Sequence, residues 1–223
     1  MNAAATTTSI QAIIWDLDGV ILDSSEDHRI SWHHLAHKKK LAFTDEQFYA
    51  TFGMRNDEII PMLWGPMDME QIKEFGEIKE LYYRKSIREK ATALPGAIEL
   101  LTSLRDAGFK QALASSAPVK NIEVVSEALG LERYLNALVS GETVPHGKPA
   151  PDVFLKAARE LGVDPTHCVV IEDAVHGVEA AHAGNMKCIS VAGTRDLPGL
   201  RAAELMVTDL THVTVDDIRA LGR

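Results

Sequence analysis

Acidic side chains stand where two apolar runs of the sequence end. Residues 10–15 are mostly apolar and Asp16 and Asp18 follow them, while Glu172 and Asp173 follow a second apolar run. Strands that are buried on both faces have such runs, so each acidic pair is predicted to follow a buried strand. Four carboxylates brought together would repel one another unless a cation lay between them. Hard oxygen ligands suit Mg²⁺, so the sequence predicts a magnesium site.

A hydroxyl group and an amine stand in comparable places. Ser115 follows the short apolar run 112–114, and Lys148 lies between a strand-like run, 137–139, and a predicted helix. With the acids balanced by a metal ion, Lys148 would be free to hold an anion such as phosphate. Each of these residues alone would be an ordinary cap or surface residue. Their joint placement at strand ends is what predicts a site.

Helical patterns alternate with the apolar runs. Each predicted helix ends near a glycine, the expected residue just past a helix end. The predicted helices cover residues 97–107, 119–129, 152–161 and 175–183. Strands and helices in alternation predict an α/β fold with a doubly wound parallel sheet and helices on both faces. Ligands bind beyond the carboxyl ends of the strands in such sheets, where the acids, the serine and the lysine fall.

One long stretch after the first acids departs from this alternation. It contains no credible strand, and its longest element is a charged helix predicted at residues 69–90. We interpret the stretch as an all-helical cap inserted after the first strand. The predicted domains are a core formed by residues 1–22 and 93–223 and a cap formed by residues 23–92.

Composition limits the classes of function. The chain has 223 residues, 46% of them hydrophobic, and a formal net charge of −9, which disfavours a nucleic-acid surface. No apolar stretch approaches the ~20 residues of a membrane span, and the first ten residues lack the pattern of a signal peptide. Cys168 and Cys188 lie in apolar runs and are expected to be buried free thiols. We therefore expect a cytoplasmic location.

Four short motifs occur together in the chain. Asp16 opens the segment DLDGVILD, Ser115 follows Leu-Ala, Lys148 lies in Gly-Lys-Pro, and Glu172 and Asp173 belong to IEDA. Together they resemble the four signatures of the haloacid dehalogenase superfamily, in the right order and over most of the chain. The resemblance implies a Rossmann-like core, Mg²⁺ as the cofactor and phosphoryl transfer through an aspartyl-phosphate. The expected partner is then a small phosphorylated metabolite, and we expect a monomer or weak homo-oligomer.

The resemblance also implies a role for each motif residue. Asp16 would attack phosphorus and carry the phosphoryl group, and Asp18 would protonate the leaving oxygen and then take a proton from the next acceptor. Ser115 and Lys148 would hold the phosphoryl oxygens. The Mg²⁺ ligands would be the side chains of Asp16 and Asp173 and the backbone carbonyl of Asp18. Glu172 would act through the metal or its water. Phosphoryl transfer depends on positioning and charge neutralisation, which agrees with this division.

The predicted cap resembles the branch that contains β-phosphoglucomutase and related sugar phosphatases. The segment DSSEDH implies that His28 helps to orient Asp18. The motif Gly-Met-Arg implies that Arg55 grips a substrate phosphate, and Lys79, four residues before a tyrosine, resembles the cap lysine of that branch.

The residues after the predicted phosphate-binding serine depart from the mutase pattern. Polar residues there help a mutase to hold its non-reacting phosphate, but this chain has Ser-Ala-Pro-Val, where Ser116 and Asn121 would substitute only in part. We therefore favour hydrolysis of a small phosphomonoester such as a sugar phosphate, with a β-phosphoglucomutase-type mutase as the alternative. A non-catalytic phosphometabolite-binding protein is a remote alternative, because Asp16 and Asp173 are both present. A dinucleotide-binding oxidoreductase is disfavoured, because the first strand leads into acids rather than a glycine-rich loop.

Overall fold

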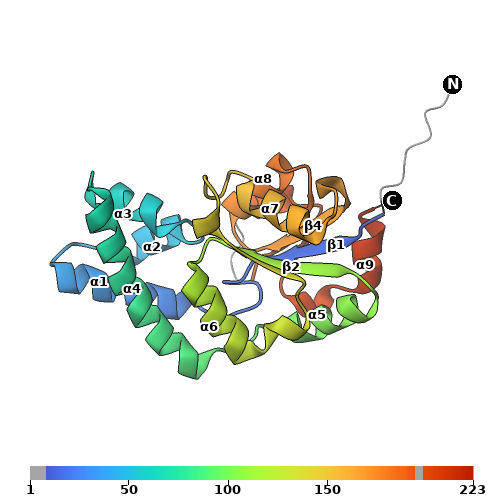
Figure 1. Cartoon of the computed structure of the whole chain (residues 1–223), viewed down its shortest axis with the longest axis horizontal. Coiled ribbons are helices and arrows are strands. Elements are labelled where there is room, and N and C mark those ends of the chain that lie inside the picture. The colour runs from blue at the N-terminus through green and yellow to red at the C-terminus, as the bar shows by residue number, and fades with distance from the viewer. Residues whose placement is uncertain (1–8, 194–197, 223) are drawn as a thin grey trace.

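The computed structural model describes residues 9–193 and 198–222, and strands and helices alternate along most of it (Figure 1). One six-stranded sheet has the order β3-β2-β1-β4-β5-β6, and every neighbouring pair is parallel. The strands are β1 Ala12–Trp15, β2 Lys110–Ser115, β3 Ala137–Ser140, β4 Cys168–Glu172, β5 Lys187–Val191 and β6 Leu205–Val207. The predicted α/β fold with a parallel sheet is confirmed.

Helices cover both faces of the sheet. Helices α7 Asp152–Leu161 and α8 Val175–Ala183 lie on one face (Figure 1). The other face carries α5 Ala97–Asp106, α6 Val119–Leu129 and α9 Val215–Ala220. Within β1, Ile13 and Trp15 belong to the hydrophobic cluster on the side of α5, α6 and α9, and Ile14 belongs to the cluster on the side of α7 and α8. Burial on both faces explains why the sequence of β1 is apolar without alternation.

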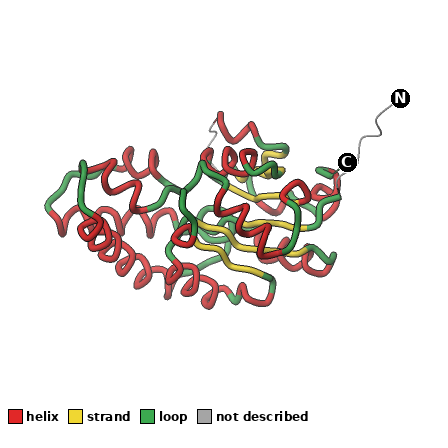
Figure 2. The backbone as a smooth tube through the Cα atoms, turned by 45° about the horizontal axis from the view of Figure 1, so that its top comes forward, coloured by secondary structure: helices red, strands yellow, loops and turns green. Residues whose placement is uncertain are grey.

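Four helices, which we call the cap helices, lie at one end of the molecule, beyond the sheet (Figure 2). They are α1 Ser25–Lys39, α2 Asp45–Thr51, α3 Asn56–Trp64 and α4 Met69–Lys90. They enclose a hydrophobic cluster of their own around Trp32, Phe48 and Ile60. The chain leaves and re-enters the sheet layer at one place, marked by a bridge between Leu22 and Ala93. The domain boundaries given above stay predictions.

Two further expectations concern cysteines and membrane spans. Cys168 and Cys188 are free and buried, as predicted. In the part of the chain that the structure describes, none of the helices combines the length and apolarity needed to cross a membrane.

Candidate active site

The carboxyl ends of the central strands bring the predicted core residues together. Trp15 of β1 pairs with Ile171 of β4, and the Asp16 amide donates a 2.9 Å hydrogen bond to the Ile171 carbonyl. Asp16 and Glu172 therefore emerge next to each other from the sheet edge. Ser115 ends the neighbouring strand β2 at the same edge. The parallel register thus produces a site from residues that are far apart in the sequence.

Lys148 lies between two of the carboxylates. Its Nζ donates to Asp16 Oδ1 at 2.6 Å and to Glu172 Oε1 at 2.5 Å, and it lies 4.7 Å from the centre of the Phe154 ring. Burial acts to lower the pKa of Lys148, but the charges of the two carboxylates outweigh it and raise the pKa above the ordinary value. The lysine is therefore a fixed positive charge at this edge.

Glu172 is held in place from both sides. While Oε1 accepts from Lys148, Oε2 accepts from the backbone amides of Asp173 at 2.7 Å and Ala174 at 2.6 Å. A Cβ at Gly177 would overlap the Glu172 carboxylate, so only glycine allows helix α8 to approach it this closely. Glu172 thus positions Lys148 and the turn after β4.

Asp16 lies in an excess of negative charge. Burial raises its pKa well above the usual range, the neighbouring Lys148 acts in the opposite direction, and the charges of Glu172 and Asp173 raise it further. A single lysine therefore does not balance the three carboxylates, and a bound cation would.

The oxygen donors at this edge fit a hard divalent cation. Gly19 has a φ of +84°, and a Cβ there would overlap the Asp173 carboxylate, so this carboxylate lies directly against the loop that follows Asp16. Across residues 9–193 and 198–222, no three His, Cys, Asp or Glu side chains are grouped as ligands of a metal ion. A cation bound by Asp16 and Asp173 would need backbone oxygen or water to complete its shell.

Asp18 is oriented differently from Asp16, because it faces the cap helices. Its Oδ1 accepts from Ser24 Oγ at 2.5 Å and from Tyr83 Oη at 3.3 Å, and it lies 3.2 Å from His28 Nε2. Burial acts to raise the pKa of Asp18, but its interactions with His28, Ser24 and Lys79 outweigh burial and lower the pKa to about 2. Asp18 is therefore ionised at neutral pH in the ligand-free protein.

A chain of contacts fixes the His28 ring. Its Nδ1 lies 2.7 Å from Lys79 Nζ, and the ring stacks on Tyr83 with centroids 4.0 Å apart. An ammonium group can only donate, so Nδ1 accepts and the ring proton lies on Nε2, which points at Asp18. Lys79 Nζ also donates to Glu80 Oε1 at 2.8 Å. The structure therefore places His28 against Asp18, with Lys79 on the far side of the imidazole ring.

A cavity of about 50 Å³ separates the sheet edge from the cap helices. Both aspartates of the DLD motif line it, together with Ser115, Ser116 and Lys148 from the sheet side. The cap side contributes polar and charged groups: His28, Asn56, Lys79 and Glu80. The core motif residues and two of the three predicted cap residues thus meet around one small cavity.

Arg55 does not line this cavity. Its guanidinium binds both Asp57 carboxylate oxygens, at 3.0 and 2.6 Å, and donates to the carbonyls of Val144 at 3.2 Å and Pro145 at 3.5 Å. In this conformation Arg55 joins α3 to the loop before Lys148. Its role in gripping a phosphate stays a prediction.

Sequence reasoning missed several residues of the cap side. Ser24 and Tyr83 bind Asp18 directly, and Glu80 and Asn56 line the cavity. Glu80 is the residue next to Lys79 in the sequence. Tyr83 follows Lys79 by four residues, so the helical period of α4 could have indicated that Lys79 and Tyr83 share a face. Sequence spacing gives no comparable signal for Asn56, which belongs to another helix.

Comparison with known proteins decides the family. Residues 13–191 match the family model of haloacid dehalogenase-like hydrolases. The chain belongs to this family. The prediction of a hydrolase-type enzyme is thereby confirmed. The structure also resembles β-phosphoglucomutase from Clostridium difficile, with a TM-score of 0.86, 28% identity and coverage of 96% of this chain and 97% of that one.

Curated relatives of different lengths match the chain. β-Phosphoglucomutase from Bacillus subtilis is 31% identical, over 93% of this chain and 93% of that protein. Hexitol phosphatase B from Escherichia coli K12 is 30% identical, over 96% of this chain and 99% of that protein. The chloroplastic protein Suppressor of quenching 1 from Arabidopsis thaliana is 33% identical over 96% of this chain. The chain spans only 21% of that relative's length.

Proposed function

We propose that this chain is a Mg²⁺-dependent phosphatase that hydrolyses a small phosphomonoester, such as a sugar phosphate, through an aspartyl-phosphate on Asp16. The observation that carries the proposal is that two aspartates of one loop lie in different surroundings. Asp16 is buried against Lys148, while Asp18 lies against His28 on the cap side of the same cavity. One carboxylate can then attack phosphorus while the other transfers the proton.

The reaction would proceed in two steps, and Asp16 and Asp18 account for every bond and proton transferred. In the first, an Asp16 oxygen bonds to phosphorus, the bond from phosphorus to the ester oxygen breaks, and the leaving oxygen takes a proton from Asp18. In the second, water attacks the phosphorus and gives a proton to Asp18, and the bond to Asp16 breaks to release inorganic phosphate. Asp18 has a low pKa in this structure, and the negative charge of a bound phosphate dianion would raise it and so favour the protonated form that the first step needs.

Other residues of the edge would hold charge during both steps. Lys148 and Ser115 would bind phosphoryl oxygens. Asp16, Asp173 and the backbone carbonyl of Asp18 would hold Mg²⁺, which when bound supplies positive charge to the phosphoryl group. Glu172, whose oxygens accept from Lys148 and from the amides of Asp173 and Ala174, would act through the metal or its water.

The activities for which two relatives are named support the substrate class. Hexitol phosphatase B from Escherichia coli K12 and a phosphorylated carbohydrates phosphatase from Thermotoga maritima, 30% and 28% identical, are both phosphatases of carbohydrate esters by name. A phosphosugar mutase is the second candidate, favoured by the likeness to β-phosphoglucomutases. Against it, the cavity wall after Ser115 is formed by Ser116, Ala117 and Pro118, which offer no cation to a second phosphate. A cytoplasmic location and a monomeric or weakly associated state stay predictions.

Phosphate release from a panel of sugar and hexitol phosphates, with Mg²⁺ and with EDTA, tests the proposal. We expect release that requires Mg²⁺ and is lost in Asp16→Asn. β-Glucose 1-phosphate belongs in the panel together with a bisphosphate primer. Conversion to glucose 6-phosphate with little free phosphate would favour the mutase, and neither reaction with any ester would contradict both candidates.

A further inference from the structure

Glu80 places a carboxylate on the cap side of the cavity, where the substrate's non-reacting part would lie. Its side chain is only 4% exposed, and its Oε1 accepts from Lys79 Nζ at 2.8 Å. Burial acts to raise the pKa of Glu80, but Lys79, His28 and the hydrogen bonds outweigh it and keep the pKa below the ordinary value. The charge of the cap lysine is therefore compensated within the protein.

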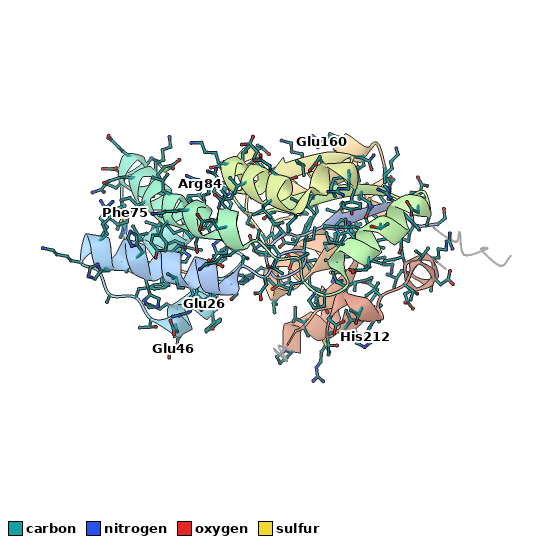
Figure 3. All side chains as sticks on the ribbon, turned by 90° about the horizontal axis from the view of Figure 1, so that it is seen from below. Glu26, Glu46, Phe75, Arg84, Glu160 and His212 are labelled. Carbon is teal, nitrogen blue, oxygen red and sulfur yellow. The ribbon has the colours of Figure 1, made fainter. Side chains whose placement is uncertain are left out.

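Amide side chains from two other helices hold the Glu80 carboxylate in one position. Asn56 of α3 donates to Oε1 at 2.7 Å, and Asn121 of α6 donates to Oε2 at 2.6 Å. Arg84, which lies where α4 meets α6 (Figure 3), donates to Asn121 Oδ1 at 2.9 Å and so fixes which way this amide points. A carboxylate with all of these partners has little freedom to turn away from a ligand.

The charges that line the cavity are unequal in number. Among the described residues that line it, five carry carboxylates and two carry ammonium groups: Asp16, Asp18, Glu80, Glu172 and Asp173 against Lys79 and Lys148. Lys148 is bound between the core carboxylates, and Lys79 is bound to Glu80 and His28. The positive charges of Lys148 and of the proposed metal ion would bind one phosphoryl group. A second phosphate on the cap side would meet Glu80 and a lysine that is already paired.

We propose that Glu80 determines the substrate class by excluding a second phosphate, so that the enzyme accepts monophosphate esters whose remaining part is an uncharged polyol. This inference rests on the proposed phosphatase function. The uncharged hydroxyl groups of a polyol can donate to the carboxylate, whereas a second phosphate is repelled by it. Glu80 would thus also act against turnover of a bisphosphate, which a mutase needs.

A matched pair of hexose esters tests the role of Glu80. kcat/KM for phosphate release is measured with glucose 6-phosphate and with glucose 1,6-bisphosphate, in the wild type and in Glu80→Gln. We expect the wild type to prefer the monophosphate, and Glu80→Gln, which keeps the shape but frees the Lys79 charge, to shift the ratio toward the bisphosphate by about tenfold. An unchanged ratio, or a wild type that favours the bisphosphate, would overturn the proposal.

Two control variants separate charge from structure. Glu77→Gln removes a carboxylate from the same helix, but its side chain is 56% exposed and contacts Arg84 and Lys120 rather than the cavity. Asn121→Ala removes one of the groups that hold Glu80 while Glu80 keeps its charge, so its shift in the ratio should be smaller than that of Glu80→Gln. Glu77→Gln should leave the ratio within about twofold of the wild type. A shift in Asn121→Ala as large as in Glu80→Gln would mean that cap position, not charge, sets the preference.

Binding measurements keep this inference separate from the proposed reaction. Calorimetric Kd values for the same two esters are measured with Asp16→Asn and with Asp16→Asn combined with Glu80→Gln. The second variant should bind the bisphosphate about tenfold more tightly relative to the monophosphate than the first. Absence of turnover in the wild type with every ester would contradict the phosphatase. The ratio of Kd values would still support or overturn the role of Glu80.

Discussion

Two groups of charged side chains face each other across the cavity, and they differ in how far their charges are balanced. The core cluster combines three carboxylates with one lysine: Asp16, Glu172, Asp173 and Lys148. The cap cluster combines two carboxylates with a lysine and a histidine: Asp18, Glu80, Lys79 and His28. In the core cluster the pKa of Asp16 is raised, whereas in the cap cluster the pKa values of Asp18 and Glu80 are lowered.

The difference between the two clusters indicates a division of labour. The core cluster has unbalanced negative charge, which suits it to bind a cation and a phosphoryl group but makes it unfavourable when empty. The cap cluster is closer to balance, and its hydrogen bonds fix Asp18 and the walls of the cavity. The attack on phosphorus would then depend on the core cluster, and proton transfer by Asp18 and selection among phosphate esters would depend on the cap cluster.

The largest expected effect is that of Asp16→Asn. An amide cannot attack phosphorus, so phosphate release should fall by about a thousandfold or more. Steady-state assays with a saturating ester and Mg²⁺ measure it. Circular dichroism of the variant serves as the control for folding. Activity within tenfold of the wild type would show that Asp16 is not the nucleophile.

Lys148→Met should reduce kcat/KM by about a hundredfold and also make the protein depend on metal for stability. Without the lysine, Asp16 and Glu172 lose the ammonium group that lies between them, and breaking such a buried pair costs about 3–5 kcal/mol. Thermal unfolding with and without Mg²⁺ measures this. Added Mg²⁺ should stabilise Lys148→Met more than the wild type. An equal gain in both proteins would contradict the excess charge that we assign to the core cluster.

His28→Gln should lower kcat by about ten- to a hundredfold with little change in KM, because His28 positions Asp18 and is not predicted to hold the phosphate. The variant should also shift the basic limb of the pH–rate profile toward higher pH, because Asp18 must be protonated in the first step and loss of His28 removes an interaction that lowers its pKa. A change confined to KM would instead assign His28 to substrate binding.

Asparagine at positions 16 and 18 should change stability in opposite directions in metal-free protein at pH 7. The lowered Asp18 pKa contributes about 2 kcal/mol above its unfolded pKa, so Asp18→Asn destabilises. The raised Asp16 pKa means that its ionised form is unfavourable in the native state, so Asp16→Asn stabilises. The Asp18 contribution is lost as pH falls from about 4 to about 2. Urea unfolding at pH 7 and pH 3 in EDTA measures the change in unfolding free energy for each variant. Changes of the same sign at pH 7 would contradict the difference that we describe between the two clusters.

Arg55→Ala should have the smallest effect, about two- to fivefold on KM, if Arg55 only joins the cap to the loop before Lys148. A guanidinium that grips a substrate phosphate would cost much more on removal, about a hundredfold in kcat/KM. Steady-state kinetics with one ester therefore distinguish the contact in this structure from the role implied by the resemblance. Asp57→Ala, which removes the other partner of Arg55, is the control.

The sequence by itself determined the fold and the core cluster. Buried parallel strands have continuous apolar sequences, and functional residues must follow them directly, so Asp16, Ser115 and Glu172 were recognisable from local pattern. Helices α6, α7 and α8 have the predicted bounds, because apolar periodicity and a following glycine define them. Strand β6, with three residues, and α9, with six, were not predicted, because elements this short carry too little periodicity.

Only the tertiary structure decided that Glu80 joins the cap cluster and which residues hold it. Glu80, Asn56 and Asn121 come from three helices, and their hydrogen bonds depend on how α3 and α4 lie against α6. The same packing turns Arg55 toward Val144 and Pro145 rather than into the cavity. Strand ends are positioned by backbone register, which a sequence encodes locally. Contacts between helices depend on crossing geometry and side-chain fit, which a single sequence does not display.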